Sequence, residues 1–297
     1  MTDMPRGVVP FDLLGGQPPN ALALAIDEDH VTYGELTVRT AAIRRALAAL
    51  DLPSGAIIAW AGQTTVEAVA FELATTSLDL TWCAIGARST ERELTDLFER
   101  VRPGVVVHDA DEVGQRTTTR VQAAIDNTGL TIVEIGIGGD GRTATVADLI
   151  DIGTALTADP PVHRTRMINR IQFTSGTESQ PKAVGLSSLA MMSNAQAMVT
   201  AMRLGSDDRF LSPLPLNHAA GYCTLLTTLT SGGALITQRF FRAAEAVSLM
   251  RQHQCTAFRG VDPIFVELLR EAADDPPAIR TGVVSTVNTE LRARLIA

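Results

Sequence analysis

The stretch Ile171–Val184, IQFTSGTESQPKAV, joins an apolar strand to a long helix through a loop of small and hydroxylated residues that ends in Pro181 and Lys182. Such a loop can hold a phosphate, because small residues let the backbone approach, N–H and hydroxyl groups donate hydrogen bonds, and a lysine adds a positive charge. The pattern differs from the P-loop G-x-x-x-x-G-K-[ST]. The loop chemistry alone leaves a phosphate site and a polar surface connection equally open.

Apolar strands and amphipathic helices alternate on both sides of this loop. Strands are expected at 56–61, 81–85, 105–108, 131–135, 170–173, 209–211, 234–237, 255–258 and 282–285. Helices are expected at 34–50, 65–77, 91–100, 187–203, 243–253 and 263–273. This alternation predicts a doubly wound α/β fold, and apolar runs such as VVV at 105–107 favour parallel strands. Thr90 and Glu93 have the spacing of a capping box at a helix start.

A polar stretch, Thr157–Arg166, separates two blocks of the alternation. It predicts a boundary between a first α/β lobe, residues 12–165, and a second lobe, residues 166–297. The segment Thr174–Lys182 is expected as an exposed loop between a strand and a helix. The uncharged segment 210–238 is long enough to cross a bilayer. Its prolines and the Gly232–Gly233 pair favour a buried strand, helix and strand, so no membrane span is expected.

Composition narrows the function classes. The chain has 297 residues, is 45% hydrophobic and carries a net charge of −8, which is typical of a globular protein and argues against a nucleic-acid partner. Three scattered cysteines and five histidines show no spacing typical of a disulfide framework or a metal site, so no metal ligand is expected from a motif. The start of the chain lacks a signal-peptide pattern, which predicts a cytoplasmic protein. The G-x-G-x-x-G run at 136–141 is interpreted as a turn, because no long helix follows it.

The loop segment resembles the signature of the adenylate-forming (AMP-binding) superfamily, roughly Y-T-S-G-[ST]-T-G-x-P-K-G-V. That superfamily includes acyl-CoA synthetases, peptide-synthetase adenylation domains and luciferase. Glu178, Ser179 and Ala183 depart from the signature, and the T-E-S form is similar to that of some acyl-CoA ligases, which favours the fatty-acid–CoA ligase branch. The matching residues are Thr174, Ser175, Gly176, Thr177, Pro181, Lys182 and Val184.

The flanking sequence extends the resemblance over residues 12 to 297, in the order of the family. VTYGEL at 31–36 is similar to the family's T-Y-x-E-L, and RPGVVV at 102–107 is similar to its x-P-x-x-V-V strand. LPLNHAAG at 214–221 resembles P-L-F-H-x-x-G, a segment that lines the acid pocket in the family. A helix, strand, Pro and helix follow over residues 240–269.

The resemblance implies two doubly wound lobes of the family's N-terminal domain, before its β-barrel and C-terminal domain. It implies a phosphate site at Thr174, Ser175, Gly176, Thr177 and Lys182, with Lys182 also the candidate catalytic residue. His218 and Gly221 become candidates for the substrate pocket, although His218 taken without the resemblance is better interpreted as a hydrogen-bonded histidine at a helix start. ATP or AMP and Mg²⁺ are the implied cofactors, a carboxylic acid the substrate, and CoA a co-substrate in fatty acid metabolism.

Several family elements are not found within the 297 residues: Y-G-x-T-E, the Asp that holds the ribose hydroxyls, and the C-terminal domain with its lysine. The segment Ser285–Asn288, STVN, also replaces the common S-G-G-A, and Val287 adds bulk where a purine would approach. We therefore expect an acid–CoA ligase portion that is inactive alone, with a truncated surface that binds a partner chain or itself. The alternative is a non-catalytic nucleotide- or acyl-binding protein. The identity of the acid is not predicted.

Overall fold

The computed structural model describes residues 8–110, 116–137, 144–164, 168–174, 182–272 and 276–285. The chain divides into two compact units. Unit 1 comprises Met1–Gly15 and Glu35–Met191, and unit 2 comprises Gly16–Gly34 and Met192–Ala297. Two helices, α1 (Tyr33–Ala49) and α6 (Ser188–Met202), contribute residues to both units.

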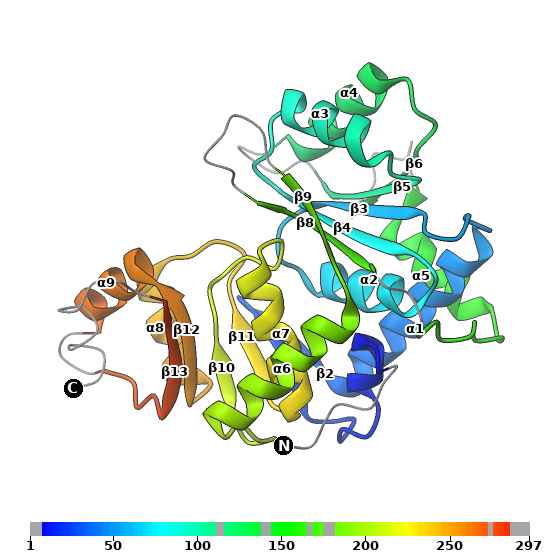
Figure 1. The fold of residues 1–297 in the computed structure, drawn as a ribbon. Coiled ribbons are helices and arrows are strands. Elements are labelled where there is room, and N and C mark those ends of the chain that lie inside the picture. Colours follow the sequence, from blue (N-terminus) through cyan, green and yellow to red (C-terminus); the bar gives the residue numbers. More distant parts are fainter. Residues whose placement is uncertain are drawn as a thin grey trace. The chain divides into compact units, whose positions relative to one another are not determined.

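Unit 1 contains a seven-stranded sheet with the order β7-β6-β5-β3-β4-β8-β9 (Figure 1). Its strands are β3 (Ile57–Gly62), β4 (Thr81–Gly86), β5 (Val105–Asp109), β6 (Val133–Ile137), β7 (Ala144–Thr145), β8 (Arg170–Thr174) and β9 (Lys182–Leu186). All neighbouring strands are parallel except β8 and β9, which are antiparallel. Its other elements are the 3-10 helix η1 (Pro10–Leu14), α2 (Val66–Ser77), α3 (Glu91–Val101), α4 (Thr117–Thr128) and α5 (Val146–Ala155).

The alternation of side chains along the strands explains how unit 1 packs. Ala59, Cys83 and Val106 point to one face, where they pack against α3 and α4. Trp60 and Trp82 belong to the opposite face and stack at 6.0 Å, with Phe71 of α2 beside Trp60. Both faces are buried, as parallel strands require, and each large apolar side chain buried here stabilises the fold by about 1.5–3 kcal/mol. The expected capping box at Thr90 and Glu93 is present.

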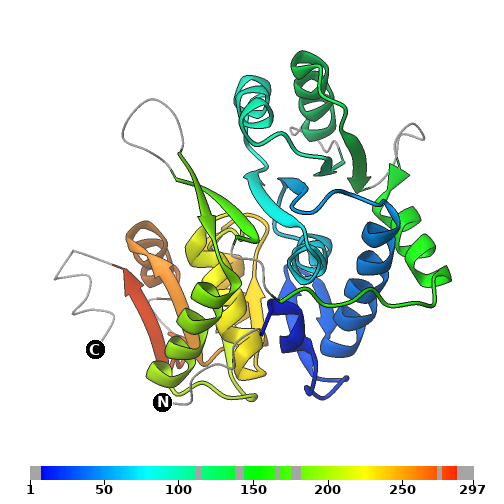
Figure 2. The same ribbon diagram turned by 45° about the vertical axis from the view of Figure 1, so that its right-hand side comes forward.

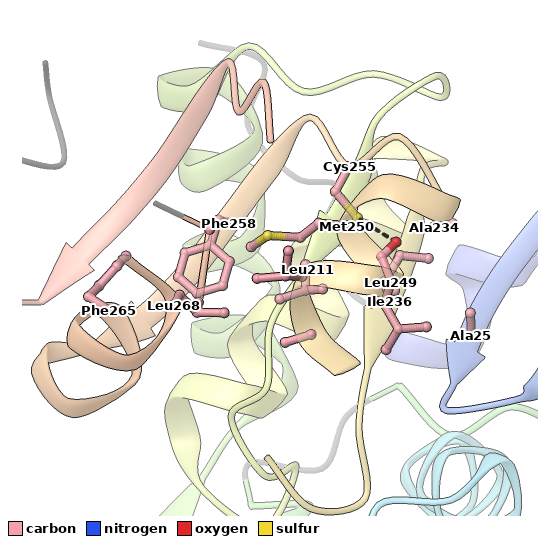
Figure 3. Close-up of a cluster of buried hydrophobic side chains, with 13 residues drawn as sticks. Ala25, Leu211, Ala234, Ile236, Leu249, Met250, Cys255, Phe258, Phe265 and Leu268 are labelled. Atoms are coloured by element: carbon pink, nitrogen blue, oxygen red, sulfur yellow. Dashed lines mark hydrogen bonds between the residues drawn. The ribbon is translucent and has the colours of Figure 1, made fainter. Parts of the chain in front are cut away.

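Unit 2 contains a six-stranded sheet with the order β13-β12-β10-β11-β1-β2. Its strands are β1 (Leu22–Ile26), β2 (Asp29–Thr32), β10 (Arg209–Leu211), β11 (Ala234–Thr237), β12 (Ala257–Val261) and β13 (Thr281–Ser285). Its helices, besides the shared ones, are α7 (Ala219–Ser231), α8 (Ala243–Gln252) and α9 (Asp262–Glu271). Leu211 and Phe258 point into the cluster formed with α8 and α9 (Figure 3). Phe210 and Ala257 pack with Met202 of α6 on the other face. The expected doubly wound α/β architecture is confirmed.

The structure adds elements that the sequence pattern did not predict. The first of these are β1 and β2, which join unit 2, where β1 pairs with β11 more than 200 residues later. The others are the 3-10 helix η1, helices α4 and α5, and strands β7 and β9. Strand β9 lies between the expected phosphate loop and α6, so the described ends of that loop belong to two strands (Figure 2). The expectation of a loop that leads directly into a helix is therefore wrong.

The compact units also divide the chain differently from the boundary expected at residues 157–166. Strands β8 and β9 hydrogen-bond into the sheet of unit 1, which continues to Met191. The polar stretch is held against the same unit: Arg44 donates to the carbonyl of Pro160, Arg45 pairs with Asp159, and the N–H of His163 donates to the carbonyl of Ser77. Within the described parts of the chain, no helix is long and apolar enough to cross a membrane.

Candidate functional site

The β8–β9 hairpin brings the two ends of the predicted phosphate loop together. Thr174 and Lys182 are partners in the antiparallel register, and the hydroxyl of Thr174 donates to the carbonyl oxygen of Lys182 at 3.5 Å. Both residues are exposed. Lys182 is also the only lysine in the sequence. The chain thus presents its one primary side-chain amine where the loop closes.

Three predicted phosphate-binding residues, Ser175, Gly176 and Thr177, lie outside the described residues. Pro181 does too. Their role remains a prediction from the sequence. The hairpin pairing places Thr174 and Lys182 at the base of the loop that contains them, as a phosphate cradle between two strands would require.

A buried ion pair fixes the base of this hairpin. Arg170, the first residue of β8, is 1% exposed and pairs with Glu72 of α2, which is 2% exposed. Oε1 of Gln172 accepts from the same guanidinium at 3.3 and 3.4 Å. Next to it, the amide of Asn169 donates to the hydroxyl of Ser188 at the start of α6. Because a buried charge is costly unless it is paired and hydrogen-bonded, these contacts hold β8 firmly against α2.

The segment LPLNHAAG forms the turn into α7. His218 is the N-cap of the helix, with an exposed side chain that makes no capping hydrogen bond. Its N–H donates to the carbonyl of Pro215 at 3.0 Å, and its carbonyl accepts from the N–H of Tyr222 at 3.1 Å. The backbone therefore fixes the position of His218 while its imidazole remains accessible.

Gly221 has a packing role in the same turn. A Cβ at this position would lie 2.2 Å from the carbonyl oxygen of Pro215 and 2.6 Å from that of Leu214. Only glycine lets the Leu214–Pro215 backbone fold so closely onto the first turn of α7. Of the two candidate pocket residues, Gly221 shapes the turn and His218 offers the chemical group.

Polar residues gather where the strands of unit 2 end. The order β12-β10-β11 places β10 between strands that follow it in the chain, so this is the point where the strand order reverses. Ligands of open α/β sheets bind outside the carboxyl ends of the strands at such a point. Ser212, Gln238 and Asp262 directly follow β10, β11 and β12, and Arg259 lies within β12, two residues before its end. Neither Ser212 nor Arg259 was predicted as a site residue, although each directly follows an apolar strand expected from the sequence, 209–211 or 255–258, which is a usable signal.

A depression lies at the opposite, amino edge of the same sheet. It has a volume of about 450 Å³ and is lined by Met250, Arg251, Gln254, Cys255, Pro276, Pro277 and Ala278. Of the predicted site residues that the structure describes, none lines it. Burial raises the pKa of the Cys255 thiol to about 12, which leaves it a poor nucleophile. Within the described ranges, no three His, Cys, Asp or Glu side chains form a set that could hold a metal ion.

Residues 14–295 match the family described as AMP-binding enzyme. The chain belongs to the AMP-binding enzyme family. Curated relatives include the acyl-CoA ligase sidI of Beauveria bassiana, 29% identical over 194 residues, which are 61% of this chain and 33% of that protein. The indoleacetate–CoA ligase of Aromatoleum aromaticum is 28% identical over 227 residues, 76% of this chain and 43% of that protein. The chain thus spans less than half the length of these two relatives.

The fold of this AMP-binding chain also matches solved structures. The inhibitor-bound N-terminal domain of FACL13 from Mycobacterium tuberculosis superposes with a TM-score of 0.81 at 20% identity, and the match covers 97% of this chain and 73% of that one. The anthranilate–CoA ligase AuaEII in complex with anthranoyl-AMP gives a TM-score of 0.83 at 16% identity, over 95% of this chain and 56% of that one. The predicted family, with its acyl-CoA ligase relatives, and the predicted architecture are confirmed.

Proposed function

We propose that this chain provides the phosphate- and acid-binding parts of an AMP-forming acid–CoA ligase. In that reaction a carboxylate oxygen attacks the α-phosphate of ATP, which gives an acyl-AMP and releases pyrophosphate. The thiol of CoA then attacks the acyl carbon, which gives a thioester and releases AMP. The observation that carries the proposal is the pairing of Thr174 with Lys182, which closes the loop that matches the family signature.

Each candidate residue has a role that suits its chemistry. The Lys182 ammonium would balance the negative charge of the phosphates, and the Thr174 hydroxyl would donate a hydrogen bond to a phosphate oxygen. His218 would contact the carboxylic acid from the start of α7, and Gly221 would maintain the turn that presents it. Mg²⁺ would bind with the nucleotide, because it is held largely by substrate phosphates and few protein ligands. Glu178 is the loop carboxylate that could share it.

A second candidate function, nucleotide binding without catalysis, is favoured by the segment after β13. Thr286–Asn288 replaces the small residues that usually follow Ser285 in this family, and Val287 would crowd a flat purine. A nucleotide displaced in this way would lose contacts to its phosphates. Losing one preorganised donor in an active site typically raises the activation barrier by about 3–4 kcal/mol, so the displaced nucleotide would react slowly. We propose that the 297-residue chain binds ATP but does not support acid-dependent exchange of pyrophosphate into ATP.

Calorimetry tests the binding of ATP, and the exchange assay tests the absence of catalysis. We expect ATP to bind the wild-type chain and to bind Lys182→Ala about tenfold more weakly, because one charge-assisted contact is lost. Arg203→Ala, which removes an exposed cation from the end of α6, is the control and should leave the affinity unchanged. Equal ATP affinity for wild type and Lys182→Ala would contradict the phosphate role. Rapid exchange with any acid would show that the chain is catalytically competent and would reject the second candidate.

A further inference from the structure

We propose that Arg259 makes the acid site of unit 2 selective for carboxylic acids that carry a second carboxylate. This inference rests on the proposed function and narrows its substrate class. It also departs from the simple fatty acid that the sequence resemblance suggested.

The strand pattern fixes the direction in which Arg259 points. Phe258 points into the cluster with α8 and α9, as Figure 3 shows, so the next residue of β12 faces the other side of the sheet. Nη1 of Arg259 accordingly lies 3.4 Å from Oγ1 of Thr224, one helical turn beyond Gly221 on α7. The arginine therefore lies beside the helix whose N-cap is His218.

Arg259 has few partners for a half-buried cation. A guanidinium has five N–H donors, yet the hydroxyl of Thr224 is the acceptor it meets, and that hydroxyl donates its own proton to the carbonyl of Ala220 at 2.9 Å. Over the described residues, Nε of Arg259 is buried without a hydrogen-bond partner, and the guanidinium forms no ion pair with a carboxylate. Asp262, three residues on, lies in the first turn of α9, where the helix N-terminus stabilises a negative charge.

A second orphaned polar atom lies next to Arg259 in the sheet. Leu211 of β10 is the register partner of Phe258, so Ser212 follows at the level of Arg259. Ser212 is 2% exposed, and its Oγ has no hydrogen-bond partner within the described part of the chain. Buried polar atoms are almost always hydrogen-bonded, so two unmatched donors side by side at the carboxyl edge indicate an acceptor that comes from a ligand.

A carboxylate is the acceptor that fits this pair. Its two oxygens match the fork of a guanidinium in a bidentate arrangement, and its negative charge balances a cation that the chain leaves unpaired. The reacting carboxylate of the substrate must meet the α-phosphate of ATP, so a group held by Arg259 would be a second one. A plain alkyl chain would instead place methylene groups against an unpaired charge, which is unfavourable.

The test compares matched acids on the purified chain by calorimetry. Adipate and hexanoate have the same six carbons and differ by one carboxylate. We expect the wild type to bind adipate at least about tenfold more tightly than hexanoate, because a charge-assisted hydrogen bond is worth about 1.5–3 kcal/mol. Arg259→Met should remove this preference, and Arg259→Lys, which keeps the charge but loses the fork, should retain part of it. Arg270→Met, at an exposed arginine of α9, is the control and should behave as wild type.

Each outcome decides the proposal. Equal affinity of the wild type for both acids, no binding of either acid, or an undiminished adipate preference in Arg259→Met would overturn it. If Arg259→Met does not fold, Arg259→Lys and the wild-type preference still give the answer. ATP binding measured in parallel separates the two levels: ATP binding without an adipate preference rejects only the role of Arg259. An adipate preference without ATP binding rejects only the nucleotide-dependent function.

Discussion

Arg170 in unit 1 and Arg259 in unit 2 each reach from a strand towards a helix, but only Arg170 meets a carboxylate there. Arg170 pairs with Glu72 and contacts Gln172, so its charge is balanced within the fold. Arg259 meets one hydroxyl at 3.4 Å. Both guanidinium groups lose hydration on burial. This loss costs free energy unless a carboxylate or hydrogen-bond acceptors replace the water. The difference separates an arginine that supports the structure from one that is available to a ligand.

The largest effect should come from leaving Arg170 without its carboxylate. Glu72→Ala removes the partner of a fully buried cation, which we expect to lower the free energy of unfolding by about 3–5 kcal/mol. Urea denaturation followed by circular dichroism measures this change. Glu99→Ala, at an exposed position of α3, is the matched control. A loss below about 1 kcal/mol for Glu72→Ala would mean that the pair contributes little to the fold.

The next effect should come from the turn that carries His218 and leads to Thr224. Gly221→Ala forces a Cβ against two backbone carbonyls, and we expect a loss of about 1–3 kcal/mol in the free energy of unfolding, with weaker acid binding. Gly205→Ala is the matched control, because it makes the same substitution at a glycine where a Cβ would meet no atom within 4 Å. Equal stability of the two variants would show that the turn can open without cost.

Arg259→Met tests whether Arg259, unlike Arg170, can be removed without loss of stability. Since no carboxylate would be left unpaired among the described residues, we expect a free energy of unfolding within about 1 kcal/mol of the wild type, or higher. The same urea denaturation applies. A loss as large as that of Glu72→Ala would indicate that Arg259 is a structural arginine and that the two sites are alike.

Arg280 provides an intermediate case with a pH signature. Burial raises the pKa of Asp208, but hydrogen bonds from Thr256, Arg280 and the N–H of Gly205 outweigh it, so the pKa lies below its ordinary value. A carboxyl with a lowered folded pKa contributes stability above its ordinary pKa, and this is lost as the pH falls through the folded value. Arg280 is half-exposed, so Arg280→Met should cost less than about 1 kcal/mol at pH 7.

The cost of Arg280→Met should shrink as the pH falls below about 4, because protonated Asp208 no longer attracts the guanidinium. Denaturation series at pH 7 and pH 3 measure it. A cost that is the same at both pH values would mean that packing of the arginine stem, and not its charge, is what the substitution removes.

The elements predicted from the sequence are those with strong local patterns. Strands β10 and β11 have the expected bounds, because short apolar runs between polar residues define them. Strand β9 was missed because nearly all of its residues are exposed and no alternation marks it. Strand β1 was missed because its parallel partner lies more than 200 residues away. Strand β12 begins two residues later than expected, because Cys255, although buried like a strand residue, lies with Thr256 in the connection that precedes the strand.

In the candidate site too, the parts with a local sequence pattern were predicted and the parts formed by distant residues were not. The loop and the LPLNHAAG segment were found because their residues are contiguous, as a resemblance requires. The Arg170–Glu72 pair joins positions 98 residues apart, and the hydroxyl that Arg259 contacts belongs to α7, 35 residues earlier in the chain. No local pattern shows whether a buried arginine has a carboxylate beside it, because that depends on which helix packs against which strand.

The exposed Lys182 is a single site for labelling the chain or cleaving it. Its ε-amine and the α-amine of the N-terminus are the only primary amines in the sequence. An amine-directed reagent used at alkaline pH would therefore place a single fluorophore on a side chain, at the first residue of β9. A lysine-specific protease would have one cleavage point, at the first residue of β9, which gives two fragments and separates β8 from the rest of β9 and α6. Protection of that one bond by an added nucleotide would report occupancy of the loop without any assay of chemistry.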